Sequence, residues 1–122
     1  MRILRTTLAL AFVLVLVACA TTPTEREVPA DGSASAFVLN RSQFGMTVYI
    51  VSSSGVRHRL GFVDAMSSGR FRVPGQMVIA GGSFELFAEG RGAGGDYVSD
   101  PFTIQPGYIA NWRLPDNSVS VR

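Results

Sequence analysis

The stretch MTVYIVSSSGVRHRLGFVD, Met46 to Asp64, decides the fold class. Two apolar runs in it alternate with a period of two, and β-branched and aromatic residues dominate the first run. The residues SSSG between the runs, Ser52 to Gly55, are typical of a turn. The stretch therefore predicts two strands joined as a hairpin. Alternation would divide the side chains of the second strand between two faces: Arg57 and Arg59 on one, and His58, Leu60 and Phe62 on the other.

The same pattern continues from Phe37 to the end of the chain, with turn residues about every eight to twelve positions. Further strands are predicted at AFVLN, RFRVP, SFELFAE, YVSDPFTI, GYIANWRLP and SVSVR. Pro101 cannot donate to a strand ladder, so its segment is expected at a sheet edge or at a bulge. QMVIAGG, at 76–82, is too short to be assigned as a helix. We therefore predict an all-β fold without a helix, a single antiparallel β-sandwich of about seven or eight strands, immunoglobulin-like or transthyretin-like.

The first twenty residues, MRILRTTLALAFVLVLVACA, have a different character. Two arginines precede an apolar run from Leu8 to Val17, and small residues follow. This order is typical of a bacterial secretory signal, and the run is too short to span a bilayer. The next stretch, ATTPTEREVPADGSASA, has few large apolar residues and predicts a flexible tether. The predicted divisions are a signal peptide at 1–18, a tether at 19–36 and a sandwich domain at 37–122.

The sequence Leu16-Val17-Ala18-Cys19 resembles the lipobox of bacterial lipoproteins, and Cys19 is the only cysteine. The resemblance implies that the signal is cut between Ala18 and Cys19 and that the Cys19 thiol carries a diacylglycerol. Two or three acyl chains would make the attachment lasting. By the same resemblance, Ala20 in place of Asp favours the outer membrane, on its periplasmic face, in a cell that has one. The alternative is an A-x-A site, Ala18-Cys19-Ala20, for ordinary signal peptidase, which would discard the cysteine.

Six pieces of the folded part form a recognisable series: Asn40, Val48 to Ile50, Arg57 to Val63, Ser99 to Pro101, Pro106 to Leu114 and Ser118 to Arg122. Together they resemble the bodies of small uncharacterised bacterial lipoproteins. No assigned function accompanies this resemblance, so the function has to be argued from the residues themselves.

The charge of the chain changes once the predicted signal is set aside. The chain has 11 basic residues, all of them Arg, and 9 acidic ones. Two of the arginines lie in the predicted signal, so the rest of the chain carries no formal net charge. The pI of 9.2 therefore belongs to the precursor and does not indicate binding to nucleic acid. One cysteine cannot form an internal disulfide. The chain has only one histidine, which does not support a zinc site, so no cofactor or metal is predicted.

Two features invite a catalytic interpretation. His58, the only histidine, is expected to pack partly buried beside Leu60 and Phe62; a hydrolase using His58 stays an alternative, although no serine lies in a G-x-S-x-G elbow. EGRGAGGD, at 89–96, is rich in glycine, but a strand and not a helix is expected after it, and it lacks the lysine of a phosphate-binding loop. We therefore predict a hairpin loop there and do not predict an enzyme.

The arginine pairs give the strongest indication of binding. If VRHRLGFV and SGRFRVP paired as a hairpin, four side chains would share one face: Arg57, Arg59, Arg70 and Arg72. Four guanidinium groups could bind phosphate or carboxylate on lipopolysaccharide, peptidoglycan or an acidic protein. The alternative is a solvated face whose arginines pair with Glu85 and Glu89, each pair contributing about 0–1 kcal/mol.

The sequence thus favours a lipoprotein of the cell envelope whose sandwich domain has a binding or structural role. Its expected partners are the membrane, through acyl groups on Cys19, and an envelope polyanion or another envelope protein. An accessory subunit of a larger envelope complex fits the same features. The arginine face and the His58 hydrolase are the alternatives to this interpretation.

Overall fold

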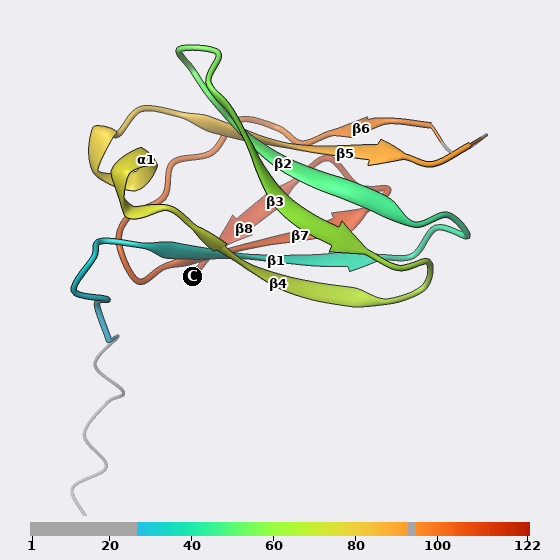
Figure 1. The fold of residues 1–122 in the computed structure, drawn as a ribbon, viewed down its shortest axis with the longest axis horizontal. Helices are drawn as coiled ribbons and strands as arrows, with labels where there is room; N and C mark the ends of the chain where they lie inside the picture. Colours follow the sequence, from blue (N-terminus) through green and yellow to red (C-terminus); the bar gives the residue numbers. More distant parts are fainter. Residues whose placement is uncertain (1–26, 93–94) are drawn as a thin grey trace, which may run out of the picture.

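The structure, a computed structural model, describes residues 27–92 and 95–122 (Figure 1). The predicted signal peptide, the residues that resemble a lipobox and the first part of the predicted tether lie outside the described residues. In the described ranges the chain forms eight strands and one short helix. In chain order these are β1 (Ala34–Asn40), β2 (Met46–Ser52), β3 (Arg57–Val63), β4 (Ser68–Val73), α1 (Gly75–Ala80), β5 (Phe84–Gly90), β6 (Tyr97–Val98), β7 (Ile109–Leu114) and β8 (Val119–Val121).

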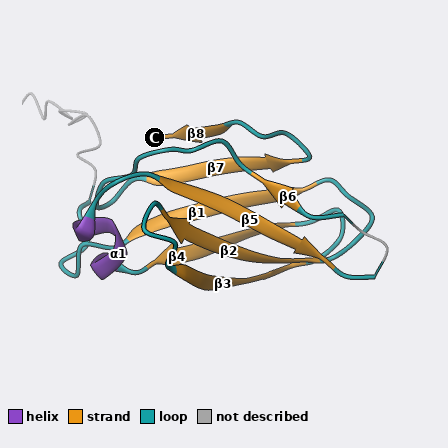
Figure 2. Ribbon diagram, turned by 90° about the horizontal axis from the view of Figure 1, so that it is seen from above, coloured by secondary structure: helices purple, strands orange, loops and turns teal. Residues whose placement is uncertain are grey.

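The strands form two four-stranded sheets, in the orders β4-β1-β7-β8 and β3-β2-β5-β6. The sheets lie face to face as two layers, with α1 at one end (Figures 1 and 2). Buried and half-buried residues alternate along β1, β2 and most of β5, because one face of each sheet packs against the other sheet. The predicted all-β sandwich is therefore confirmed for the described part of the chain.

One strand pair departs from the antiparallel arrangement that the sequence predicted. β1 and β7 are parallel neighbours, with Ala36 beside Ala110 and Val38 beside Trp112. Parallel neighbours need a long connection, and here the chain between them passes through the opposite sheet. β1 and β2 also lie in different sheets, whereas the first two strands of an immunoglobulin domain pair within one sheet. Of the two sandwich types predicted, the transthyretin-like one is the closer description.

The helix α1 corrects the prediction of a fold without helices. It follows Pro74 and ends at Gly81 and Gly82, whose φ angles are 73° and 86°. Positive φ angles of this kind favour glycine, so the two glycines explain where the helix stops. A helix of six residues is too short for its periodicity to be read from the sequence. No helix in the described ranges is long and apolar enough to cross a bilayer.

A β-bulge in β3 changes which side chains share a face. Val48 of β2 lies opposite Gly61, but the next residue, Tyr49, lies opposite Arg59, so Leu60 is the extra residue. A bulge reverses the alternation on one side of it. Phe62 and His58 are consequently on opposite faces, and the prediction that they share a face with Leu60 is wrong.

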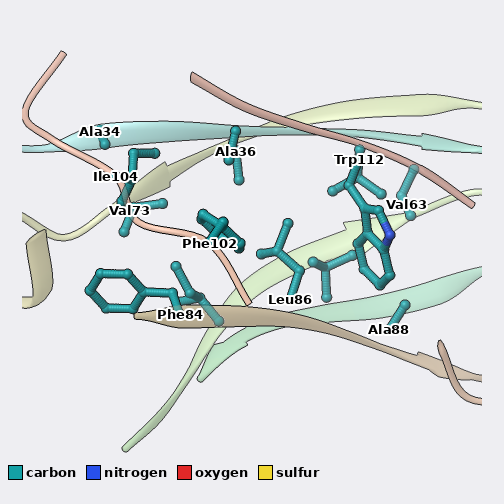
Figure 3. Close-up of a cluster of buried hydrophobic side chains, with 14 of the residues drawn as sticks. Ala34, Ala36, Val63, Val73, Phe84, Leu86, Ala88, Phe102, Ile104 and Trp112 are labelled. Carbon is teal, nitrogen blue, oxygen red and sulfur yellow. The ribbon is translucent and has the colours of Figure 1, made fainter. Parts of the chain in front are cut away.

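The core fills the space between the sheets (Figure 3). Trp112 of β7 is fully buried, and its Nε1 donates a hydrogen bond of 2.7 Å to the carbonyl oxygen of Asp116. Figure 3 shows the indole lying toward Leu86 and Ala88 of the opposite sheet. The indole therefore contributes to both layers while its one polar atom stays bonded.

The folded domain begins earlier than the predicted boundary at Phe37. β1 starts at Ala34, and Ala34 and Ala36 are both buried between the sheets. The small side chains that suggested a tether are the ones that fit this close packing. Before β1, Gly32 lies against Ile79 of α1, so the segment that leads into β1 is held at the end of the sandwich where α1 lies.

Candidate functional site

The structure divides the four predicted arginines between the two outer faces of the sandwich. β3 pairs with β2 and β4 pairs with β1, so the predicted hairpin between β3 and β4 does not form. Arg57 and Arg59 lie on the outer face of the β3-β2-β5-β6 sheet, and Arg70 and Arg72 lie on the outer face of the other sheet. The four-arginine face is therefore a wrong prediction.

Phe71 gives the physical reason for this separation. Its side chain belongs to the inner face of β4, opposite the buried Ala36. A Cβ atom added to Gly61 of β3 or to Gly69 of β4 would come within 2.6 Å or 2.8 Å of the Phe71 ring. The ring thus occupies the space beside both strands where the two sheets meet. The sequence did not show that Gly61 and Gly69 would both face Phe71, so the hairpin interpretation missed this contact.

Arg57 is engaged by its neighbours on the outer face of the β3-β2-β5-β6 sheet. Its Cζ lies 3.9 Å from the ring centroid of Tyr49 and 4.6 Å from that of Phe87. Its Nη2 is 3.7 Å from Oε2 of Glu89, and the Tyr49 hydroxyl donates to the same oxygen at 3.3 Å. The predicted alternative of a solvated face paired with Glu89 therefore describes Arg57. Cation–π contacts and exposed ion pairs of this kind each contribute about 1 kcal/mol or less.

Arg72 is engaged on the other outer face. It forms an ion pair with Asp31, which precedes β1, and Oδ1 of Asp31 accepts a hydrogen bond of 3.0 Å from the backbone N–H of Ser33. The hydrogen bonds from Ser33 and then the contact with Arg72 lower the pKa of Asp31 to about 2. The ion pair between Asp31 and Arg72 therefore holds the segment that precedes β1 against β4.

His58 is exposed, which corrects the expectation that it is partly buried. It is the second residue of β3, before the bulge, and lies opposite Ile50. No hydroxyl or carboxylate hydrogen-bonds to its ring among the described residues, so the structure assembles no catalytic dyad around it. The described ranges also contain no group of three or more His, Cys, Asp or Glu side chains that could hold a metal ion.

The glycine-rich segment at 89–96 is followed by a strand, as the sequence predicted. This strand is β6, and the backbone N–H of Gly90 donates to Oδ1 of Asp96 at 3.3 Å. Pro101 also lies where the sequence predicted, after the two-residue edge strand β6. Ser99, which lies between β6 and Pro101, stays bonded to β5, because its Oγ accepts a hydrogen bond of 2.8 Å from the backbone N–H of Leu86.

The surface that sequence reasoning missed is the outer face of the β4-β1-β7-β8 sheet. The strand register arranges its side chains in rows: Arg70, Phe37, Asn111 and Ser120 form one row, and Ser68, Leu39 and Arg113 form the next. A third row contains Arg72, Ser35, Ile109 and Arg122, since Ile109 and Arg122 exchange two backbone hydrogen bonds. Four arginines thus surround half-buried apolar side chains on this face.

A hollow of about 400 Å³ lies on this face, over β1, β7 and β8. Phe37 and Leu39 supply its apolar lining, and Asn111, Arg113, Ser120 and Arg122 supply polar groups. Alternation along GYIANWRLP puts Asn111 and Arg113 on the face of the strand opposite Trp112, and in β7 both lie on the face away from the buried Trp112. The sequence could not show that β1 would lie beside β7, and this parallel pairing is what brings Phe37 and Leu39 to the hollow.

Comparison with known proteins assigns the chain to no family. No protein-family model and no curated protein matches the chain. Among solved structures the chain is similar to the NMR structure of a protein from Eubacterium rectale, at 10% sequence identity and a TM-score of 0.45. That match covers 74% of this chain and 86% of the other. The class that the fold and the surface define is a small β-sandwich domain.

Proposed function

We propose that the protein is a lipid-anchored protein of the bacterial cell envelope whose sandwich domain binds or supports another envelope component. The observation that carries the proposal is the sequence Leu16-Val17-Ala18-Cys19, in which the only cysteine follows an apolar run behind two arginines. This segment lies outside the described residues, so its support comes from the sequence. Position, flanking residues and the single thiol all agree with a lipobox.

The proposed anchor works through the chemistry of the thiol. A thiolate is the strongest nucleophile among the common side chains and forms a stable thioether, so Cys19 would accept the diacylglycerol. Cleavage between Ala18 and Cys19 frees an amino group that can take a further acyl chain. Two or three chains hold a protein durably, whereas one chain holds it only marginally. By the lipobox resemblance, Ala20 in place of Asp favours the outer membrane, on its periplasmic face, in a cell that has one.

The proposed role of the domain is non-catalytic. A two-layer sandwich offers two broad outer faces on a rigid core, and both faces here carry arginines beside aromatic side chains. Such surfaces suit contact with a polyanion or a protein of the envelope. The proposal therefore has two parts, the anchor and the binding face, and they can be tested separately.

The anchor is tested by the intact mass of the protein extracted from its native membrane. We expect the mass of a chain that begins at Cys19 plus two or three acyl groups. A Cys19→Ser variant should lose the acyl mass, while a Thr21→Ser control should keep it, since Thr21 lies outside the lipobox. A chain beginning at Thr21 in both the natural protein and the Cys19→Ser variant would contradict the proposal, because it would show cleavage by ordinary signal peptidase.

A further inference from the structure

We propose that the hollow on the outer face of the β4-β1-β7-β8 sheet binds a small amphipathic anion, a molecule with a compact apolar body and one sulfonate, carboxylate or phosphate group. Phe37 and Leu39 would contact the apolar body. Arg113 and Arg122, with the Ser120 hydroxyl and the Asn111 amide, would hold the anionic group. The inference deepens the binding role proposed for the domain and does not depend on the lipid anchor.

The first argument is the balance of charge around the hollow. Arg57 and Arg72 each form an ion pair with an acidic side chain, whereas Arg113 and Arg122 form none with the described acidic residues. Both lining arginines are exposed; Arg113 lies on β7, and Arg122 directly follows the neighbouring strand β8 on the same face. A guanidinium group binds sulfonate, carboxylate or phosphate through paired, charge-assisted hydrogen bonds, so two of them beside one hollow favour an anion.

The second argument is the apolar lining. Phe37 and Leu39 are outward-facing residues of β1, at the centre of the sheet, and both are only half-buried. Their neighbours across the strands are polar, Arg70 and Asn111 beside Phe37 and Ser68 and Arg113 beside Leu39. An apolar group placed over them would remove the remaining exposed surface from water, which is favourable. Charge and apolar surface together therefore indicate a ligand with both properties.

The third argument concerns the size of the ligand. Sites for small molecules are concave and typically enclose about 300–1,000 Å³, and the hollow of about 400 Å³ falls in that range. A flat surface such as a bilayer would meet the exposed Arg113 and Arg122 before it reached the half-buried Phe37 and Leu39. A small molecule satisfies both sets of groups at once.

Asp116 also lines the hollow and bears on the test. It lies in the turn between β7 and β8, and its carboxylate would repel an anion nearby. Its backbone carbonyl bonds to Trp112, but its side chain is not needed for that bond. Removing the charge with Asp116→Asn should therefore tighten binding while the turn is preserved.

The test is a fluorescence titration of the chain from Glu27 to Arg122, which contains every described strand and the whole described core. The probe is anilinonaphthalene sulfonate, which has aromatic rings and one sulfonate. Its uncharged counterpart is phenylnaphthylamine, which has the same rings without the sulfonate. We expect saturable binding of the sulfonate that weakens with added salt, and at least about fivefold weaker binding of the uncharged compound.

Variants locate the site. Arg113→Gln and Arg122→Gln should each weaken binding of the sulfonate about five- to tenfold, and Asp116→Asn should strengthen it about twofold or more. The matched control is Arg59→Gln, because Arg59 is also exposed, lies on the opposite outer face and forms no ion pair with the described acidic residues. All these side chains are exposed, so folding should be retained, as an amide NMR spectrum would verify.

The same NMR spectra give an independent readout of position. Amide shifts on adding the sulfonate should gather around Phe37, Leu39 and Asn111. The proposal would be overturned by the absence of saturable binding, by equal affinity for the two compounds, or by shifts gathered on the β3-β2-β5-β6 face. It would equally be overturned if Arg59→Gln weakened binding as much as Arg113→Gln. The Cys19 mass experiment can fail or succeed without changing any of these outcomes.

Discussion

At the scale of single residues, Asn40 links the loop that follows β1 to the loop that follows β3. It is fully buried, and its Nδ2 donates to the carbonyl oxygens of Phe44 at 2.8 Å and Asp64 at 3.1 Å. Its Oδ1 accepts hydrogen bonds from the N–H and the hydroxyl of Ser42 at 2.9 Å and 2.7 Å. Only an amide both donates and accepts in this geometry.

Asn40→Asp should therefore destabilise the fold strongly. The new carboxylate could still accept from Ser42, but it would face two carbonyl oxygens with no proton to donate. We expect the free energy of unfolding at neutral pH to fall by about 2–4 kcal/mol, measured by urea denaturation. Asn117→Asp, at an exposed position, is the control and should change it by less than about 0.5 kcal/mol. A variant at residue 40 as stable as the natural chain would disprove the role given to the amide.

Asp31 predicts a dependence of stability on pH. Hydrogen bonds from Ser33 and the contact with Arg72 lower its pKa from 3.8 to about 2. The charged form is therefore favoured in the folded state, and its contribution is present above the unfolded pKa and is lost as the pH falls through about 2. Unfolding temperatures of the natural chain and Asp31→Asn should differ near neutral pH and converge at about pH 2. A difference that stayed constant over this range would contradict the assignment.

At the scale of elements, alternation predicted the strands that are regular. Alternation along SFELFAE and GYIANWRLP puts Phe84, Leu86 and Ala88 on one face of β5 and Trp112 and Leu114 on one face of β7, and all five are buried. Each of these strands keeps a period of two through its central part, so the sequence alone is enough to orient it.

The sequence did not predict the structure correctly where the backbone departs from the period of two. The bulge at Leu60 reverses the faces of β3, because one extra residue shifts the alternation without changing the composition. The helix α1 has fewer than two full turns, so it leaves no periodic signal. The candidate hollow was hidden for a further reason: several residues that line it are ordinary outward positions until the strand order brings them together, namely Phe37 and Leu39 of β1, Asn111 and Arg113 of β7 and Ser120 of β8.

At the scale of the whole molecule, strand order is the property that alternation cannot supply. A strand with one buried face fits equally well beside several neighbours. Pairing of strands adjacent in the sequence holds for β2 with β3, for β5 with β6 and for β7 with β8, but it fails for β3 with β4. The chain instead crosses between the two sheets at β1–β2, β3–β4, β4–β5 and β6–β7, so the two layers are interleaved along the sequence.

This interleaving predicts that both sheets unfold together. Leu86 of β5 is fully buried, and the single tryptophan, Trp112, reports from the opposite sheet. Leu86→Ala should lower the free energy of unfolding by about 2–5 kcal/mol, because it removes buried methyl groups and leaves a cavity. The loss should be the same whether followed by Trp112 fluorescence or by far-ultraviolet circular dichroism, as a two-state transition requires. Val98→Ala, at a side chain 47% exposed, should cost about 0.5 kcal/mol or less. If Leu86→Ala shifted the circular dichroism transition but left the Trp112 transition in place, the sheets would be separate cooperative units and the shared core would not couple them.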